Sequence, residues 1–206
     1  MKAQLYAEGE LAIGFDPPEG ARALDPASLP KLDVSRLPGA ELLGRLAFEA
    51  PSARAGGGCA RGSSGRFVPG IEGVLFEKAT WFALQGAELS PDALELGSTE
   101  TSGGVTRQSL RGRRGDDAVA IEHLLAFAGP DSDVVLCSTV CVGDAASCEA
   151  ASRIELEGTP SPPPTPGLFV RGALAAVEHP YEAALGLGLG AALLVALVLA
   201  KRPRDP

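Results

Sequence analysis

The stretch VAIEHLLAFAGPDSDVVLCSTVCV, residues 119–142, carries the clearest structural pattern in this chain. Its first half places apolar side chains at every second position, which is the period of a strand with one buried face. The sequence GPD at 129–131 then supplies a turn, and residues 134–142 alternate again. We therefore predict two antiparallel strands. The side chains on the predicted buried face of the first are Val119, Ile121, His123, Leu125 and Phe127.

The same pattern continues toward the N-terminus. Leu94 and Leu96 alternate with polar residues, SGG at 102–104 favours a turn, and residues 105–111 alternate again before a second turn at 112–117. Four consecutive strands at this spacing predict an antiparallel β-meander over residues 94–142.

Shorter elements are predicted on either side of the meander. Residues 11–15 and 44–48 alternate like strands, and each run ends at proline. Apolar residues at helical spacing predict a helix near 71–84. A short helix over 145–151 and a last strand over 154–156 follow the meander.

The segment SARAGGGCARGSSGR, residues 52–66, is rich in glycine, serine and arginine. Glycine-rich backbone can cradle phosphate, but here it lacks a Gly-Lys-Ser/Thr ending and a GxGxxG pattern. We therefore predict a mobile surface loop.

Composition limits the class of protein. The 206 residues carry a formal charge of −8, which disfavours a nucleic-acid binder because such proteins need a basic face. The folded part suffices for one domain of ordinary size. We predict an α+β fold over residues 1–157: a single small domain with an antiparallel β-meander and one or two packed helices.

The C-terminal part of the sequence predicts a membrane anchor. Residues 183–200, AALGLGLGAALLVALVLA, hold no charge and would span about 27 Å as a helix, close to the ~30 Å hydrocarbon core of a bilayer. A proline-rich linker at 158–167 and a juxtamembrane segment at 168–182 come before it, and a basic tail at 201–206 follows.

Two signals disagree about the side of the membrane on which the domain lies. The first 15 residues show no apolar run typical of a signal peptide, and the layout is similar to that of tail-anchored proteins, which implies a cytoplasmic domain. The positive-inside rule instead places the basic tail, with Lys201, Arg202 and Arg204, in the cytoplasm. We expect a cytoplasmic domain, and an extracytoplasmic one if the true N-terminus is longer.

Four cysteines leave several states open. Cys137 and Cys141 would lie about 13 Å apart on one strand, too far for one disulfide or one zinc ion. A bridge between Cys141 and Cys148 across a turn is geometrically feasible, and buried free thiols are the alternative. We expect no metal site and no cofactor.

No residue pattern predicts a catalytic site. His123 falls on the apolar face of its strand, where a hydrogen-bonded core histidine is commoner than a catalytic one. Arg107, Arg111 and Arg113 share one face of a hairpin and could bind an anionic partner, although a solvated strand face is the simpler interpretation.

The predicted anchor also offers a surface for self-association. Gly186 and Gly190 lie four residues apart on one helical face, the spacing that lets two membrane helices approach closely and form a homodimer. Altogether the sequence predicts a single-pass membrane protein that presents a small interaction or accessory domain to an unknown protein partner. A ligand- or lipid-binding module and a small thiol-dependent enzyme are the alternatives.

Overall fold

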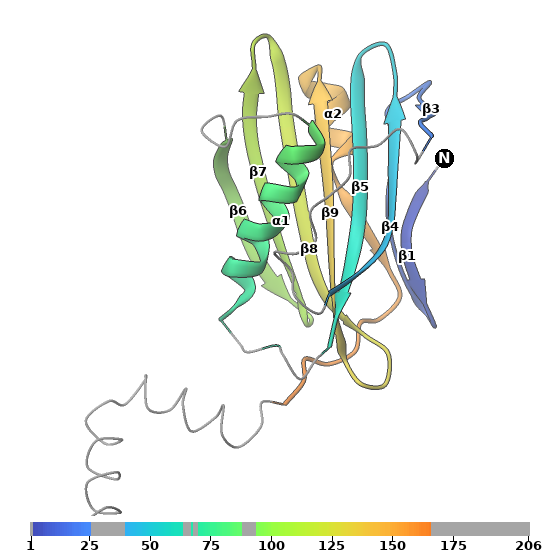
Figure 1. Cartoon of the computed structure of the whole chain (residues 1–206), viewed down its shortest axis with the longest axis vertical. Coiled ribbons are helices and arrows are strands. Elements are labelled where there is room, and N and C mark those ends of the chain that lie inside the picture. The colour runs from blue at the N-terminus through green and yellow to red at the C-terminus, as the bar shows by residue number, and fades with distance from the viewer. Residues whose placement is uncertain (1, 26–39, 64–66, 68–69, 88–93, 166–206) are drawn as a thin grey trace, which may run out of the picture. The chain divides into compact units, whose positions relative to one another are not determined.

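The computed structural model of the protein describes residues 2–25, 40–63, 67, 70–87 and 94–165. Within these ranges the chain forms ten strands and two helices (Figure 1). In chain order they are β1 (Ala3–Glu8), β2 (Leu11–Phe15), β3 (Arg22–Ala23), β4 (Ala40–Glu49), β5 (Ala53–Gly62), α1 (Glu72–Ala87), β6 (Leu94–Ser102), β7 (Val105–Arg114), β8 (Asp117–Ala128), β9 (Asp133–Gly143), α2 (Ala145–Ala151) and β10 (Ile154–Glu157).

Seven strands form one antiparallel sheet in the order β3-β4-β5-β9-β8-β7-β6. Strands β6 to β9 are neighbours in the chain and in the sheet, and they are the four strands predicted between residues 94 and 142. Strand β5 pairs with β9 along its whole length and so joins the meander to β4. The large sheet thus combines a meander with strands that come from the first third of the chain.

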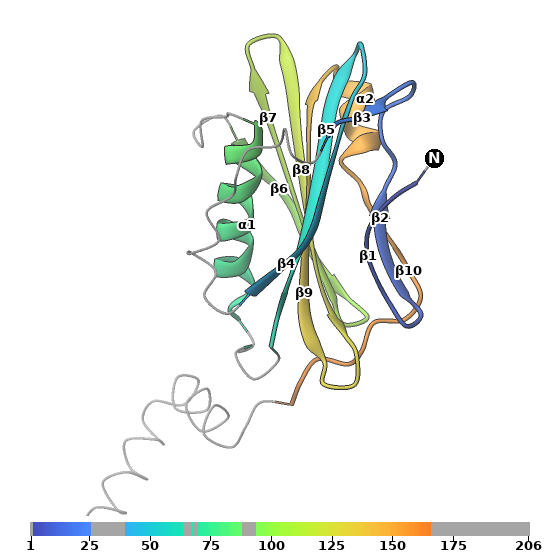
Figure 2. The ribbon, with the colours of Figure 1, turned by 45° about the vertical axis from the view of Figure 1, so that its right-hand side comes forward.

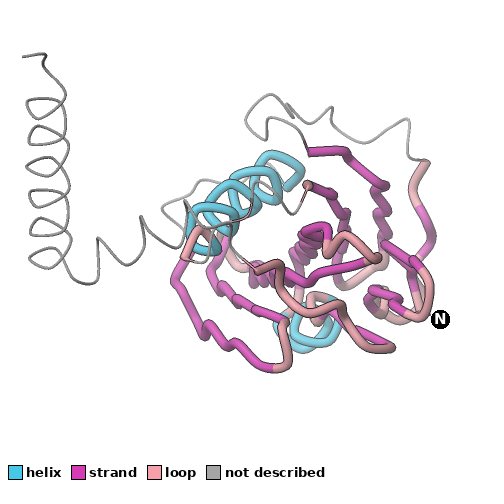
Figure 3. The backbone as a smooth tube through the Cα atoms, turned by 90° about the horizontal axis from the view of Figure 1, so that it is seen from below, coloured by secondary structure: helices cyan, strands magenta, loops and turns pink. Residues whose placement is uncertain are grey.

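Strands β1, β2 and β10 form a second, three-stranded antiparallel sheet. It packs on one face of the large sheet together with α2, and α1 covers part of the opposite face (Figure 2). Seen end-on in Figure 3, the two helices lie on opposite sides of the strands. The rings of Phe15 and Phe48 meet edge to face at 5.8 Å and join the two sheets in the main hydrophobic core.

Helix α1 confirms the helix predicted near 71–84. Phe76, Ala79, Ala83 and Leu84 recur at the spacing of one helical face and are all buried. They pack on strands β8 and β9 and on Leu110 of β7. The helix therefore lies over the meander half of the large sheet.

The α+β class predicted from the sequence is wrong. The described residues are mostly strand and form two stacked sheets of seven and three strands, with two helices. The prediction failed because β1 and β5 were not recognised as strands, and because β10 pairs with β2 and not with the meander. The architecture is a two-sheet β-sandwich with a helix on its outer face.

Strand β5 occupies the segment for which the sequence predicts a mobile loop. Glycine has a low strand propensity, yet β5 runs between β4 and β9 with three consecutive glycines. A Cβ atom at Gly58 would lie 2.8 Å from the carbonyl oxygen of Gly44, and one at Gly57 would lie 3.0 Å from that of Ser138. The neighbouring backbones therefore approach this strand more closely than a side chain would allow.

Residues up to Pro164 form one compact unit. The backbone N–H of Ser161 donates to the carbonyl of Phe127 at 2.8 Å, and its hydroxyl donates to the carbonyl of Gly129 at 2.8 Å. The first part of the proline-rich segment 158–167 thus packs on the β8–β9 hairpin.

Residues 166–206 lie outside the described residues. The predicted anchor at 183–200, with Gly186 and Gly190, and the basic tail both fall in this range. Within the part of the chain that the structure describes, no helix is both long enough and apolar enough to cross a membrane.

Candidate functional site

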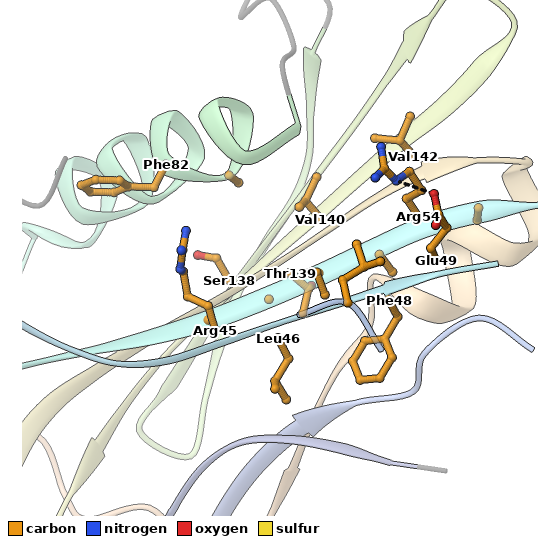
Figure 4. A pocket seen from close by; sticks show the side chains of 18 of the residues that line it. Arg45, Leu46, Phe48, Glu49, Arg54, Phe82, Ser138, Thr139, Val140 and Val142 are labelled. Atoms are coloured by element: carbon orange, nitrogen blue, oxygen red, sulfur yellow. Dashed lines mark ion pairs between the residues drawn. The ribbon is translucent and has the colours of Figure 1, made fainter. Parts of the chain in front are cut away.

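A groove runs along the outer face of the large sheet, between α1 and strands β4 and β5 (Figure 4). It exists because α1 lies over β8 and β9, so that among the described elements no helix covers the β4–β5 part of the same face. The groove has a volume of about 880 Å³, within the range of small-molecule sites in proteins.

On β4 and β5 the floor of the groove is formed largely by glycine and alanine. Ala47, Gly56 and Val140 are cross-strand partners in one row, and Ala60 pairs with Leu136 in another. Since side chains alternate between the two faces of a strand, these residues share the face that α1 partly covers. Missing or single-carbon side chains on β4 and β5 therefore give the groove its depth.

The wall of the groove that α1 forms is apolar. Helix α1 contributes Ala79, Phe82 and Ala83, and Leu42 of β4 lines the groove with 42% of its surface exposed. Leu46 and Phe48 point to the other side of the sheet in Figure 4, so they border the groove with their backbone only. An extended apolar group would find contacts along both the helix and the floor.

Ion pairs occupy one end of the groove. Glu49 binds Arg54 at 3.3 Å and Arg22 at 2.9 Å between nitrogen and oxygen. Arg22 holds the pKa of the Glu49 carboxyl below its usual value through a hydrogen bond, and the charge of Arg54 adds to this effect. This end stays charged at neutral pH, so it is a poor place for a hydrocarbon chain and limits how far such a chain could reach.

A chain of polar side chains leads from the groove into the core. The Nδ1 atom of His123 lies 2.8 Å from the Ser138 hydroxyl, and its Nε2 atom lies 2.8 Å from the Thr80 hydroxyl. Thr80 donates its one hydroxyl proton to the carbonyl of Phe76 at 2.8 Å, so its oxygen accepts from Nε2–H. The imidazole is therefore protonated at Nε2, and Nδ1 accepts a hydrogen bond from Ser138.

His123 is a core residue with both ring nitrogens satisfied. It has no exposed surface, and the ring of Phe76 stacks on it at 5.8 Å. Burial lowers the pKa of His123 to about 3, so the ring is neutral at physiological pH. A base this weak is poorly matched to proton transfer near pH 7. The interpretation of His123 as a hydrogen-bonded core histidine fits this geometry.

Arg45 lies on the same cross-strand row as Ser138. Arg45 pairs with Gly58, Gly58 pairs with Ser138, and Ser138 pairs with His123. Figure 4 shows the side chains of Arg45 and Ser138 rising from the sheet on the side of α1, where Phe82 lies. Between the two polar side chains is a glycine with no side chain at all. The row therefore adds a polar position to the groove besides the charged end at Glu49 and Arg54.

The cysteines form two buried disulfides. Cys59 of β5 joins Cys137 of β9 with their Cα atoms 4.1 Å apart, and Cys141 joins Cys148 of α2 with Cα atoms 5.1 Å apart. The second pair is the one whose spacing made a bridge feasible. The first was not foreseen, because it needs β5 to be a strand beside β9. Within residues 2–25, 40–63, 67, 70–87 and 94–165, no His, Cys, Asp or Glu cluster could hold a metal ion.

The three arginines of the predicted stripe are in different situations. Arg107, Arg111 and Arg113 share one face of β7, as their spacing requires. Arg107 binds Glu122 at 2.7 Å and donates to the carbonyl of Ile154 at 2.7 Å, whereas Arg111 and Arg113 are exposed. This face is opposite to the groove, so the structure does not bring the stripe together with Ser138 and Arg45.

The groove residues were missed because the sequence places them in separate segments. Arg45 and Ser138 are 93 positions apart, and the strand that brings them together is β5. One signal could have revealed β5: Ala53, Ala55 and Cys59 are small apolar residues at odd positions, and all three are buried.

No protein-family model matches this chain, and no curated protein matches it. Among solved structures it is similar to the crystal structure of LpqN involved in cell envelope biogenesis of Mycobacterium tuberculosis. The two share 12% sequence identity and a TM-score of 0.35, over 77% of this chain and 91% of that chain.

Proposed function

We propose that this protein is a membrane-anchored binding module whose groove holds the acyl chain of a lipid. The observation that carries the proposal is the form of the groove: a long floor of glycine and alanine beside an apolar helix wall that includes Phe82. Sites for small ligands are typically concave and mostly apolar, with few polar groups. An extended hydrocarbon chain fits a site of this kind, and no chemical step is required of the protein.

The C-terminal sequence supports a lipid as the occupant. The apolar run 183–200 has the length and composition of a membrane-spanning helix, and the segment before it is rich in proline. A domain held by such an anchor would remain close to a bilayer, where acyl chains are abundant.

We further propose that the domain lies on the non-cytoplasmic side of the membrane. Both cysteine pairs are placed for disulfides, and disulfides persist in oxidising compartments. The basic residues after the apolar run favour the same orientation under the positive-inside rule. This arrangement gives less support to a thiol-dependent enzyme, because all four sulfur atoms are engaged in buried bridges.

Photocrosslinking of the full chain in lipid nanodiscs tests acyl-chain binding. The probe is a fatty-acyl methyl ester with a diazirine in its chain, and peptide mass spectrometry maps the labelled positions. We expect labels in residues 40–62 and 72–87 in addition to the anchor. Ala60→Leu adds bulk to the groove floor and should reduce the groove labels roughly tenfold, the effect of about 1.4 kcal/mol.

The matched control is Ala146→Leu, the same substitution at an exposed position of α2. It should leave the labelling pattern unchanged. Labels confined to residues 183–200 in the wild type would contradict acyl-chain binding in the groove.

A reporter that is active only outside the cytoplasm, fused to the N-terminus, tests the orientation. We expect strong activity. An inactive reporter on a stably expressed fusion would contradict the proposed side and favour the cytoplasmic alternative.

A further inference from the structure

Ser138, His123 and Thr80 form a chain of hydrogen bonds beneath the groove. This chain determines whether Ser138 can donate a hydrogen bond to a ligand or only accept one. Each hydroxyl in the chain has one proton to donate, and the neutral imidazole has one, on Nε2. The order of donors therefore runs from Ser138 through His123 and Thr80 to the carbonyl of Phe76. The proton of Ser138 is therefore committed to Nδ1 of His123. What Ser138 presents to the groove is an oxygen with lone pairs, which accepts hydrogen bonds.

The burial of His123 keeps this arrangement in place. The ring has no exposed surface, so water cannot replace Ser138 as the donor to Nδ1. If Ser138 turned its proton toward a ligand, a buried ring nitrogen would be left without a partner, which proteins rarely tolerate. Ser138 is thus held as an acceptor by residues that do not touch the ligand themselves.

Arg45 supplies hydrogen-bond donors on the cross-strand row that also contains Ser138. A guanidinium has five N–H donors and no acceptor. A Cβ atom placed on Gly58 would come within 3.0 Å of Cγ of Arg45, so the stem of this arginine packs closely over the glycine. Ser138 is the cross-strand partner of Gly58 on its other side. Donors and an acceptor therefore lie on either side of Gly58 in the groove floor.

We propose that Ser138 and Arg45 recognise a neutral ligand head that carries a carbonyl acceptor and an N–H donor together, as in an acyl amide. The carbonyl would accept from Arg45, and the N–H would donate to Ser138. A carboxylate could pair with the charge of Arg45, but both of its oxygens are acceptors, so it has no donor for the oxygen of Ser138. This inference rests on the proposed acyl-chain binding and specifies the head group that the same groove prefers.

Competition between simple ligands tests the inference on the full chain in nanodiscs. The diazirine methyl ester is displaced from residues 40–62 and 72–87 by oleamide, methyl oleate or oleate, which share one acyl chain. Oleamide has an acceptor and a donor, whereas the ester and the carboxylate have acceptors only. We expect oleamide to compete about 3- to 10-fold better than methyl oleate, the effect of one hydrogen bond, and better than oleate.

Ser138→Ala should remove the preference of oleamide over methyl oleate. Ser98→Ala, at an exposed position of β6, is the matched control and should keep the preference. If Ser138→Ala does not fold, the ranking of the three ligands on the wild-type protein still decides the matter.

Each outcome has one meaning. Equal competition by the three ligands, or a preference for oleate, overturns the head-group inference and leaves acyl-chain binding intact. An equal loss for all three ligands in Ser138→Ala shows a structural role and overturns the inference as well. No groove labelling by the probe means that acyl-chain binding itself has failed.

Discussion

Acidification should destabilise the folded domain through His123. Burial lowers the pKa of this ring to about 3 in the folded state, against 6.5 for an ordinary histidine. Between these two values the unfolded chain binds a proton that the folded protein does not, so the free energy of unfolding falls as the pH falls. Each unit below 6.5 costs about 1.4 kcal/mol. At pH 5.0 the domain should therefore be about 2 kcal/mol less stable than at pH 7.5.

Urea unfolding of the full chain in detergent micelles can measure this effect. Trp81 is the only tryptophan and lies on α1, so its fluorescence reports on the domain. The comparison protein is His123→Leu, which has no group to protonate at this position. Burial raises the pKa of Glu122, whose contribution has the opposite sign but is common to both proteins. The same pH dependence in both proteins would refute the assignment of the effect to His123.

Three further predictions concern the core and the disulfides. Gly58→Ala should lower the free energy of unfolding by about 1–3 kcal/mol, because its Cβ would lie 2.8 Å from a backbone oxygen. Gly62→Ala on the same strand has nothing within 4 Å of the new Cβ atom and should be nearly neutral. Equal thermal stability of the two variants would contradict the close approach of β4. Ile121→Ala should cost about 2–5 kcal/mol in urea unfolding, since this side chain has no exposed surface, and a loss below 1 kcal/mol would place it outside the core. Alkylation of the unfolded, unreduced protein should modify no cysteine and alkylation after reduction should modify four, as read by intact mass; four adducts without reduction would show free thiols.

Regular periodicity made part of the fold predictable from the sequence. Strands β8 and β9 are buried over most of their length, and apolar residues recur at every second position in both. Helix α1 is buried along one stripe, so its apolar residues recur at helical spacing. In each case burial of the element leaves a periodic mark in the sequence.

The rest of the fold depends on contacts that leave no such mark. Strand β5 is composed largely of glycine and alanine because the backbones of β4 and β9 come close to it, and this composition is also typical of a loop. If β5 is not recognised as a strand, no disulfide partner can be assigned to Cys59, and Arg45 and Ser138 cannot be placed on a common cross-strand row. The role of His123 likewise depends on Thr80, which comes from α1 and lies 43 positions away.

The route by which the chain leaves the domain has a mechanical consequence. Beyond β10, Gly158 packs so tightly that a Cβ atom there would lie 2.0 Å from the carbonyl oxygen of Glu10, at the β1–β2 turn. Three residues later Ser161 is held on the β8–β9 hairpin by two hydrogen bonds. A pull along the segment that follows would therefore load the β8–β9 hairpin of the large sheet first, and the hydrogen bonds of Ser161 would have to break before tension reached the edge strand β10. The hydrogen bonds of Ser161 would thus protect the small sheet from a force applied through the C-terminal segment.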